Sequence, residues 1–365
     1  MSPPTTRLEN AVVADPADLT PEWLTAALRG SGLDVEVRSF RREPVGTGQM
    51  AHNERLHLEY VEAPSTEASR FAPATLVGKF PSPSAESREA GARGAYRAET
   101  IFYTSLASSL PIRTPACYYG GLSEDQSIFT LLLEDLAPAR QGDQIAGADD
   151  AEIEAAVRNL AGLHAPLQGD SRLDTFDWTL GTSDEEFALY IEMGTPVFLE
   201  RYRERLSEED AETLRRFAAG VRNWRKRAPT TRTLVHGDYR LDNLMFDSVA
   251  GEIRVAAVDW QTLSVGSGGQ DLAYLLGTSS PPEKRRLHEA RMLDVYREAM
   301  AGLGVERSAD EIRADYVHGS FQGPAITILG SLSVGQTDRG DDMFMAMAHR
   351  SASQIRDLDA LALLA

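Results

Sequence analysis

Apolar and polar residues alternate along the first third of the chain in a way that is typical of β-strands. Residues 55–60 (Arg-Leu-His-Leu-Glu-Tyr) change polarity at every step, and residues 75–80 and 128–133 are short apolar runs. Strict alternation predicts a half-buried strand, whereas a short apolar run predicts a buried one. The pattern therefore predicts a group of strands between residues 35 and 80 and a further strand at 128–133.

Two helices are predicted among these strands. Thr20 and Pro21 form a typical helix start, in which a capping residue precedes a proline, and Gly30 is a typical helix end. A longer helix is expected from about residue 88 to residue 109. Residues 1–19 show little periodicity, so we expect them to form a frayed lead-in.

Beyond residue 149 the apolar residues recur at helical spacing, with one strand-rich interruption at 233–259. A strand-rich first third and a mainly helical remainder predict an α+β protein with two lobes. We expect a lead-in at 1–19, a small N-terminal lobe at 20–136 and a large helical lobe at 137–365. The predicted helices of the large lobe span 151–164, 184–204, 207–227, 283–302, 309–329 and 341–363.

The strand-rich interruption carries the strongest chemical signal of the sequence. An apolar strand ends in the polar loop His236-Gly-Asp-Tyr-Arg-Leu-Asp-Asn243, a short apolar strand follows, and a second strand ends at Asp259-Trp260. These two strands are expected to form an antiparallel hairpin, in which the start of one strand lies beside the end of the other. Asn243 and Asp259 are thereby predicted to be neighbours.

This pair of side chains has a chemical meaning. Amide and carboxylate oxygens suit Mg²⁺, which prefers oxygen ligands and keeps positions open for phosphate oxygens. Asp238, in the same loop, could orient an attacking hydroxyl group and accept its proton. The alternative is a capped loop whose polar residues only satisfy backbone groups. A single Asp238 or Asn243 fits that alternative, but the whole set of residues fits it poorly.

The first third of the chain supplies parts that would complement the loop. Gly46 and Gly48 lie between two strand-like runs, where unhindered backbone amides can cover phosphates, although glycines are also common in ordinary hairpins. Lys79 interrupts an apolar strand and therefore requires a partner or an exit to water. Glu99 presents a carboxylate on an otherwise apolar helix face. We expect these two residues to form an ion pair that leaves the ammonium able to hold phosphate oxygens.

Composition and charge narrow the range of partners. The 365 residues include 37 Lys+Arg and 55 Asp+Glu, and the net charge of −18 disfavours nucleic acids and anionic membranes while allowing a cationic acceptor. Cys117 is the only cysteine, so no intrachain disulfide is expected. No signal-like N-terminus or membrane-spanning apolar run is evident, and a cytoplasmic protein is therefore expected, as a monomer or a homodimer.

The motif His-Gly-Asp-x-x-x-x-Asn at 236–243, followed by Val258-Asp259-Trp260, resembles the aminoglycoside phosphotransferase and choline-kinase-like superfamily. Its ecdysteroid-kinase-like subgroup is the most similar, and the resemblance covers residues 20–350. The resemblance implies a protein-kinase-like two-lobed fold, the cofactors ATP and Mg²⁺, and phosphoryl transfer to a hydroxyl of a small molecule. The Ala-Pro-Glu segment of protein kinases is not evident after Asp259, so a protein substrate is not expected.

The resemblance also implies where each part of the site lies. The loop would carry the catalytic base and one metal ligand, and the end of the hairpin would carry a second metal ligand. The small lobe and the hinge between the lobes would hold the nucleotide, the hinge through its backbone. The implied residues are Asp238 and His236 for catalysis, the latter as a brace of the loop, Asn243 and Asp259 for the metal, Gly46, Gly48, Lys79, Glu99, Glu134 and Leu136 for the nucleotide, and Asp271 as a further support of the loop.

Two other functions stay open at this stage. A catalytically silent relative that only binds nucleotide or ligand would be expected to lack Lys79, Asp238, Asn243 or Asp259, and all four are present. A metal-dependent phosphohydrolase would need further His or Asp clusters, and the seven histidines of this chain do not occur at ligand spacing. The sequence has no readable code for the acceptor, which could be aminoglycoside-, macrolide-, amino-alcohol- or sterol-like.

Overall fold

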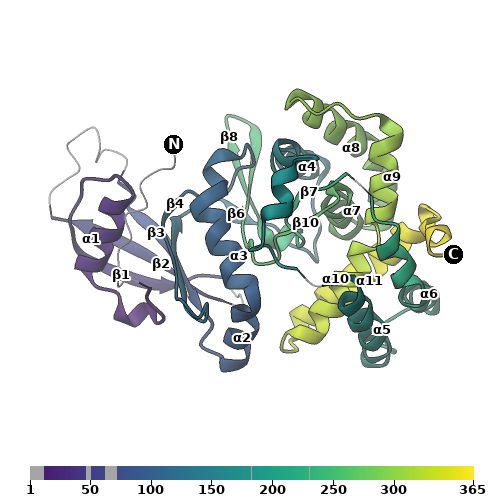
Figure 1. Cartoon of the computed structure of the whole chain (residues 1–365), viewed down its shortest axis with the longest axis horizontal. Helices are drawn as coiled ribbons and strands as arrows, with labels where there is room; N and C mark the ends of the chain where they lie inside the picture. Colours follow the sequence, from purple (N-terminus) through teal and green to yellow (C-terminus); the bar gives the residue numbers. More distant parts are fainter. Residues whose placement is uncertain (1–11, 47–50, 62–71, 182, 230) are drawn as a thin grey trace.

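A computed structural model describes residues 12–46, 51–61, 72–181, 183–229 and 231–365. Strands gather at one end of the molecule and helices at the other, so the α+β fold with two lobes is confirmed (Figure 1). The small lobe is built on an antiparallel sheet with the strand order β1-β2-β3-β5-β4. Its strands are β1 (Val37–Pro44), β2 (Ala51–Tyr60), β3 (Thr75–Pro81), β4 (Cys117–Leu122) and β5 (Phe129–Glu134).

The alternating and apolar stretches of the sequence become β2, β3 and β5, as the pattern predicts. The strand β4 has no counterpart among the predicted strands, because Cys-Tyr-Tyr-Gly-Gly-Leu contains two glycines and does not alternate. Its residues are all partly exposed, which is typical of an edge strand.

One face of the sheet is covered by α1 (Pro21–Gly30), which begins and ends where the sequence predicts. The Thr20 hydroxyl accepts a hydrogen bond from the Trp23 backbone, and Leu24 and Leu28 are buried against the sheet. The segment before α1 is packed as well. The Val13 N–H donates to the Thr130 hydroxyl oxygen at 2.7 Å, and the Thr130 hydroxyl donates to the Val13 carbonyl at 2.8 Å. The described part of the expected lead-in is therefore attached to the sheet rather than frayed.

The helix expected at 88–109 is a bent series of helical segments that runs along the sheet toward the large lobe. It comprises α2 (Ala85–Ala90) and α3 (Tyr96–Ile101), with a wide turn before and after α3. The bend between the two helices occurs at Gly94, whose φ is +131°. The sequence periodicity predicts the right length of chain but not this bend.

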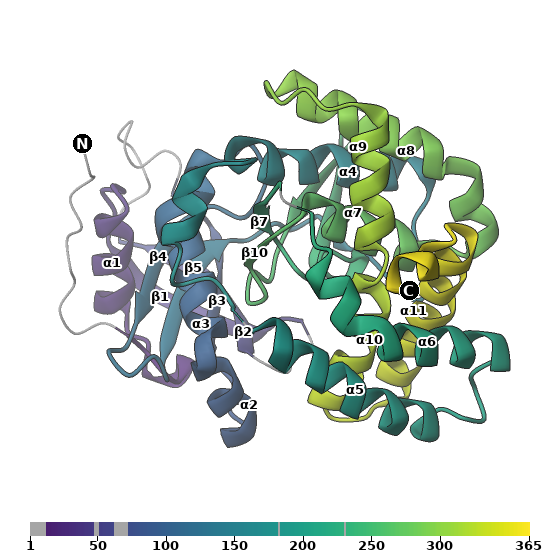
Figure 2. The ribbon, with the colours of Figure 1, turned by 45° about the vertical axis from the view of Figure 1, so that its right-hand side comes forward.

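The large lobe has two groups of helices. Figures 1 and 2 show α4, α7, α8 and α9 on one side of the lobe and α5, α6, α10 and α11 on the other. The described part of this lobe also contains five short strands. The helices are α4 (Asp150–His164), α5 (Asp184–Arg201), α6 (Glu208–Lys226), α7 (Gly268–Ser279), α8 (Pro282–Gly302), α9 (Ala309–Gly319), α10 (Gln322–Ser333) and α11 (Asp338–Asp357). The strands are β6 (Arg140–Gln141), β7 (Thr233–Val235), β8 (Leu244–Val249), β9 (Glu252–Ala257) and β10 (Ser264–Gly266).

Two helical predictions need correction. The single helix expected at 309–329 is two helices, α9 and α10, which are separated at Ser320 and Phe321. The helix α7 is absent from the predicted set, because all of its residues except Gln270 are buried. A helix without a polar face gives no helical periodicity in the sequence.

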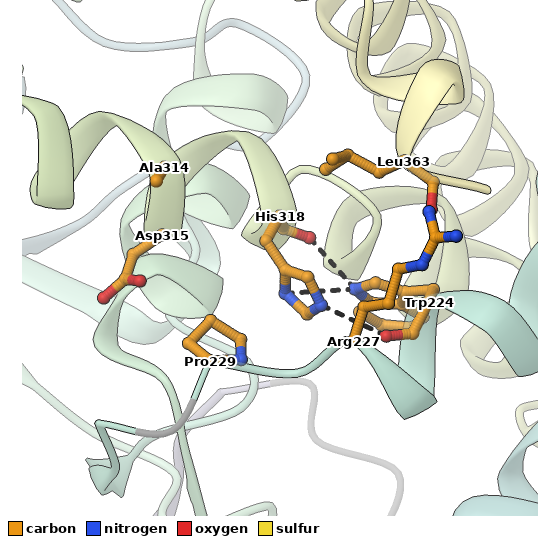
Figure 3. Close-up of a pocket in the computed structure, with 7 residues that line it drawn as sticks. All are labelled: Trp224, Arg227, Pro229, Ala314, Asp315, His318 and Leu363. Carbon is orange, nitrogen blue, oxygen red and sulfur yellow. Dashed lines mark hydrogen bonds between the residues drawn. The ribbon is translucent and has the colours of Figure 1, made fainter. Parts of the chain in front are cut away.

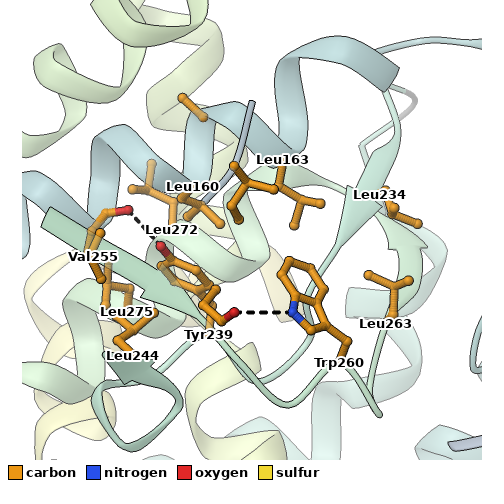
Figure 4. Close-up of a cluster of buried hydrophobic side chains, with 14 of the residues drawn as sticks. Leu160, Leu163, Leu234, Tyr239, Leu244, Val255, Trp260, Leu263, Leu272 and Leu275 are labelled. Carbon is orange, nitrogen blue, oxygen red and sulfur yellow. Dashed lines mark hydrogen bonds between the residues drawn. The ribbon is translucent and has the colours of Figure 1, made fainter. Parts of the chain in front are cut away.

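The hydrophobic core is continuous between the two lobes. Phe102, directly after α3, stacks on Trp260 with ring centroids 3.8 Å apart, and both residues belong to the core cluster that reaches α4 and α7. Figure 4 shows Trp260 and Tyr239 against leucines of α4 and α7. Among the described helices, none is long and apolar enough to cross a membrane.

Candidate active site

The helix α7 holds the loop that follows β7 through hydrogen bonds. Asp271, which is fully buried on α7, accepts hydrogen bonds from the backbone N–H groups of His236 (2.6 Å) and Gly237 (2.9 Å). Its Oδ2 also lies 3.2 Å from Nε2 of the buried His164. Asp271 therefore holds the loop in the way that the resemblance implied, and His164 is a core residue behind it.

His236 ties the start of the loop to the end of the hairpin. Its buried ring donates from Nε2 to the Val258 carbonyl (3.1 Å) and accepts at Nδ1 from the Asp238 backbone N–H (3.3 Å). Because both ring nitrogens are engaged, neither is available for proton transfer to a substrate. This geometry supports the expected bracing role of His236.

The Asp238 carboxylate is surrounded by donors. Tyr274 Oη lies 2.8 Å from Oδ1, and Asn243 Nδ2 lies 2.8 Å from Oδ2. Arg240 Nε is shared between the two oxygens at 3.1 and 3.3 Å. The side chain is 20% exposed, so the carboxylate is oriented by the protein while one edge remains open.

Asn243 and Asp259 are neighbours, as the hairpin prediction requires. In the β8–β9 register Leu244 lies opposite Ala257, and the Val258 N–H donates to the Asn243 carbonyl at 3.0 Å. The Asn243 amide nitrogen binds Asp238, whereas its Oδ1 has no hydrogen-bond partner within the described parts of the chain. The Asp259 side chain is 44% exposed, and its backbone has a positive φ of 65°.

The predicted ion pair of Lys79 and Glu99 is confirmed, and it has a third member. Lys79 Nζ on β3 lies 2.7 Å from Glu99 Oε1 on α3 and 3.1 Å from Asp259 Oδ1. The Trp260 N–H also donates to Glu99 Oε1, at 3.2 Å. Lys79 and Glu99 are buried, so a strand, a helix and the end of the hairpin meet at one ammonium group.

Burial and charge oppose each other in this cluster. Burial would lower the pKa of Lys79, but the carboxylates of Asp259 and Glu99 outweigh it and raise that pKa. Burial alone would raise the pKa of Asp259, but the Lys79 ammonium outweighs this effect and lowers that pKa. Burial raises the pKa of Glu99, which the Lys79 charge only partly offsets. Lys79 is therefore held in its charged form.

The expected hinge follows β5. The Glu134 N–H donates to the Ala116 carbonyl at 2.8 Å, and the Glu134 carboxylate pairs with Arg113 at 2.6 Å. The Leu136 N–H has no acceptor among the residues that the structure describes, so it can donate to a ligand. Of the two glycines expected over the phosphates, Gly46 follows β1 with a φ of 76°, and Gly48 lies outside the described residues.

Three further side chains hold the loop and have no counterpart in the sequence predictions. Gln144 is fully buried, donates from its backbone to Asp242 Oδ1 (2.9 Å) and accepts from the Leu241 N–H at its Oε1 (2.8 Å). Gln322, at the start of α10, donates to the Gly237 carbonyl at 3.0 Å. Tyr274 lies three residues after Asp271, on the same face of α7. That spacing would have indicated Tyr274 had α7 been predicted.

The acidic residues near the start of α11 form contacts within the lobe. Tyr202 Oη donates to Asp341 Oδ1, and Arg205 pairs with Asp342 Oδ1, both at 2.6 Å. These contacts tie α11 to the segment after α5. Asp341 and Asp342 are therefore engaged in contacts within the lobe.

Two of the cavities that the described residues line are away from the catalytic loop. One of about 690 Å³ lies in the small lobe, where α1 ends beside the segment between α3 and β4. The other, of about 260 Å³, lies in the large lobe, where the His318 carbonyl accepts from Trp224 Nε1 at 3.0 Å (Figure 3). His318 is thereby a packed core residue. The second cavity is lined by Trp224, Arg227, Pro229, Ala314, Asp315, His318 and Leu363.

In protein kinases, phosphoryl transfer uses a lysine–glutamate ion pair together with an Asp and an Asn of a catalytic loop, and this structure has the same combination. The fold and the loop place this protein among the small-molecule kinases. Residues 67–304 match the model of the phosphotransferase enzyme family (APH), and the chain belongs to that family.

Solved structures share the fold. Aminoglycoside 2′-phosphotransferase-IIIa, solved with GDP, aligns with a TM-score of 0.53 and 15% identity over 92% of this chain and 100% of that one. Ethanolamine kinase from Plasmodium vivax aligns with a TM-score of 0.51 and 13% identity over 89% and 86% of the two chains. Their two-lobed architecture agrees with the protein-kinase-like fold that the sequence predicts. No curated protein matches the chain.

Proposed function

We propose that this protein transfers the γ-phosphoryl group of ATP, in the presence of Mg²⁺, to a hydroxyl group of a small molecule. The observation that supports the proposal most strongly is the meeting of Lys79 with Glu99 and Asp259 (2.7 and 3.1 Å) beside a loop that presents Asp238. Tyr274, Asn243 and Arg240 orient the carboxylate of Asp238. Phosphoryl transfer requires an oriented carboxylate to align the attacking oxygen.

In this proposal the small lobe binds the nucleotide. Lys79 pairs with oxygens of the α- and β-phosphates, and Glu99 holds the ammonium in place from the buried side. The Leu136 N–H and the backbone of Glu134 bind the edge of the adenine. The glycines Gly46 and Gly48 belong to the segment that would cover the phosphates.

Asp238 acts on the acceptor. Its open edge accepts the hydrogen bond of the acceptor hydroxyl and points the oxygen at the γ-phosphorus, in line with the bond to the β-phosphate. As the new O–P bond forms, the bond between the γ-phosphorus and the bridging oxygen breaks. ADP leaves with that electron pair, and the hydroxyl proton passes to Asp238. His236 and Asp271 hold the loop without touching the reacting atoms.

The residues present fit a magnesium ion. Asn243 directs its amide nitrogen to Asp238, which leaves its oxygen for a cation, and Asp259 offers a partly exposed carboxylate beside it. Among the described residues no group of three His, Cys, Asp or Glu could hold a metal, so phosphate oxygens and water would complete the ligand set. The bound ion would neutralise charge on the phosphates.

The acceptor in this proposal is an amino alcohol, and hence a cation. The similar structures are named for aminoglycosides and for ethanolamine, both of which carry an amine and a hydroxyl. The net charge of −18 favours the approach of a cation.

The proposal is tested by ADP production from ATP and Mg²⁺ against aminoglycosides, ethanolamine, choline-like amino alcohols, macrolides and sterols. At least one amino alcohol should raise the rate, and Asp238→Asn should remove most of that rate while nucleotide binding remains. Asp247→Asn, on β8 of the same hairpin, is the matched control and should behave as wild type. Full turnover in Asp238→Asn would overturn the mechanism, and a response to sterols alone would overturn the amino-alcohol assignment.

A further inference from the structure

One face of α7 contacts three consecutive residues of the catalytic loop. Asp271 accepts from the backbone of His236 and Gly237, and Tyr274, one turn later, donates its hydroxyl hydrogen to Asp238 Oδ1 at 2.8 Å. The first contact holds the backbone of the loop. The second reaches the carboxylate itself, on the oxygen that Asn243 does not contact.

The donors to the Asp238 carboxylate fix its orientation. A carboxylate has about four lone-pair sites. Tyr274 takes one on Oδ1, Asn243 takes one on Oδ2, and the single Arg240 Nε–H is shared between both oxygens. With a donor fixed on each oxygen, the plane of the carboxylate is held, and the side chain is still 20% exposed.

Tyr274 is built to act as a fixed donor. Its ring is fully buried and packs with Met343, Phe344 and Met347 of α11, so the hydroxyl has one position. Burial, followed by the nearby Asp238 charge, raises the pKa of Tyr274 well above its ordinary value. The hydroxyl therefore keeps its proton and always donates toward Asp238.

Without Tyr274, the remaining donors would pull the carboxylate elsewhere. Arg240 is the other donor on Oδ1, and its guanidinium also binds Asp242 at 2.8 Å. Oδ1 would then be held only by Arg240, whose guanidinium also binds the Asp242 carboxylate. A small rotation of this kind misaligns the acceptor oxygen without disturbing the nucleotide.

We propose that Tyr274 is a positioning residue of phosphoryl transfer, whose buried hydroxyl fixes the orientation of the Asp238 carboxylate that aligns the acceptor. The inference rests on the proposed function, because it requires Asp238 to act on the acceptor. It predicts that the loss of one hydroxyl group on α7 lowers kcat and leaves the KM for ATP unchanged.

The chain offers a closely matched control for this substitution. Tyr316 on α9 is also fully buried and also donates to a carboxylate at 2.8 Å, that of Glu289. Tyr316→Phe removes the same kind of hydrogen bond, together with one that the hydroxyl accepts from Gln354 at 2.7 Å, at a place where no catalytic group is present. A purely structural effect of Tyr274→Phe would therefore be reproduced by Tyr316→Phe.

The experiment measures ADP production with the acceptor identified in the screen and, in a parallel assay, with water as the acceptor. The thermal unfolding of each variant is measured as well. Tyr274→Phe should lower kcat about tenfold or more at an unchanged KM for ATP. Tyr316→Phe should keep the wild-type kcat, with a similar loss of thermal stability. Equal kcat values in the two variants, or a rise in KM at constant kcat, would overturn the proposal.

A second measurement keeps the two proposals distinguishable. If Tyr274 acts through Asp238, Tyr274→Phe should not lower the residual turnover of Asp238→Asn any further. A further tenfold loss in that double variant would overturn the positioning role. Wild-type turnover in Asp238→Asn alone would instead overturn the proposed function. An inactive Asp238→Asn together with a fully active Tyr274→Phe would overturn only the inference about Tyr274.

Discussion

Lys79 and Asp259 are 180 residues apart in the sequence, and their side chains meet at 3.1 Å. The contact joins β3 of the small lobe to the second residue after β9 in the large lobe. Because the Asp259 carboxylate is 44% exposed and that of Glu99 is 1% exposed, the Lys79 ammonium links a buried anion to an open one. A nucleotide that enters between the lobes would therefore meet a cation whose position is already fixed.

Lys79→Met tests how much this cluster depends on its cation. The variant leaves Glu99 buried without a counter-charge, and breaking a buried pair from one side costs about 3–5 kcal/mol. We expect urea unfolding to show a loss of that size and ADP production to fall about 100-fold. Adding Glu99→Gln to Lys79→Met should recover part of the stability but none of the turnover.

An exposed ion pair on the same series of helices is the control. Arg93 and Glu89 pair at 2.9 Å with side chains that are 76% and 74% exposed. Such pairs contribute about 0–1 kcal/mol, so Arg93→Met should leave the free energy of unfolding nearly unchanged. If Lys79→Met cost no more than Arg93→Met, the ammonium would not be balancing a buried charge.

The contact between Arg55 and Asp135 predicts a pH dependence of the hinge. Arg55 Nε on β2 donates to Asp135 Oδ2 at 2.6 Å. Burial would raise the pKa of Asp135, but the Arg55 guanidinium outweighs it, so the pKa lies below its ordinary value of 3.8. A lowered pKa means that the charged form stabilises the folded state above pH 3.8, and that this stability is lost as the pH falls further.

Urea unfolding at neutral pH and at about pH 3 measures this effect, because the stabilisation follows the charge of Asp135. Asp135→Asn should be less stable than wild type at neutral pH, and the difference should shrink in acid. Arg55→Met should show the same convergence, because it removes the other half of the pair. A difference that stays constant across the two pH values would show that the carboxylate charge does not contribute.

The Asp271 side chain predicts a coupled loss of stability and activity. It is fully buried and accepts two backbone N–H groups of the catalytic loop. Asp271→Asn replaces one accepting oxygen with a donating nitrogen, and a buried donor left without an acceptor costs about 1–3 kcal/mol. We expect urea unfolding to show this loss and kcat to fall with it. Normal kcat in a destabilised variant would mean that the loop keeps its shape without the brace.

The parts of the fold that could be predicted are those with a local signal. The cap at Thr20, the alternation of β2 and the β8–β9 hairpin are each specified by a few consecutive residues, and the structure has all three. The Lys79–Glu99 pair could be predicted as well, because a charged side chain in an apolar strand or helix face requires a partner. In that case the energetic cost of burial supplies the signal.

The parts that could not be predicted depend on contacts between distant segments. The helix α7 is buried on nearly every side, so its sequence has no polar face, and Tyr274 could not be placed without it. Gln144 supports the loop across 97 residues, and an isolated glutamine carries no sign of such a contact. The sequence predicts a single helix in place of α9 and α10, because the residues between these two helices are compatible with a helix.

A substitution at Gly237 tests how little room the loop has for a side chain at this position. Its φ is +81°, and a Cβ atom there would lie 2.5 Å from the Thr262 carbonyl oxygen. Thr262 also donates its hydroxyl hydrogen to the His236 carbonyl at 2.8 Å, so the loop cannot move away without breaking that bond. Gly237→Ala should therefore lower both the free energy of unfolding and kcat.

Gly251 separates the two causes of that effect. It lies in the β8–β9 turn with a φ of +86°, and a Cβ atom there would meet nothing within 4 Å. A positive φ costs a non-glycine residue about 1–2 kcal/mol wherever it occurs, so Gly251→Ala should show that loss in urea unfolding and keep its kcat. Gly237→Ala should lose more stability, and its kcat should fall about tenfold or more, because the contact with Thr262 displaces the residue next to Asp238. Equal losses in the two variants would mean that backbone strain alone acts at Gly237, and that the loop tolerates displacement there without misaligning its carboxylate.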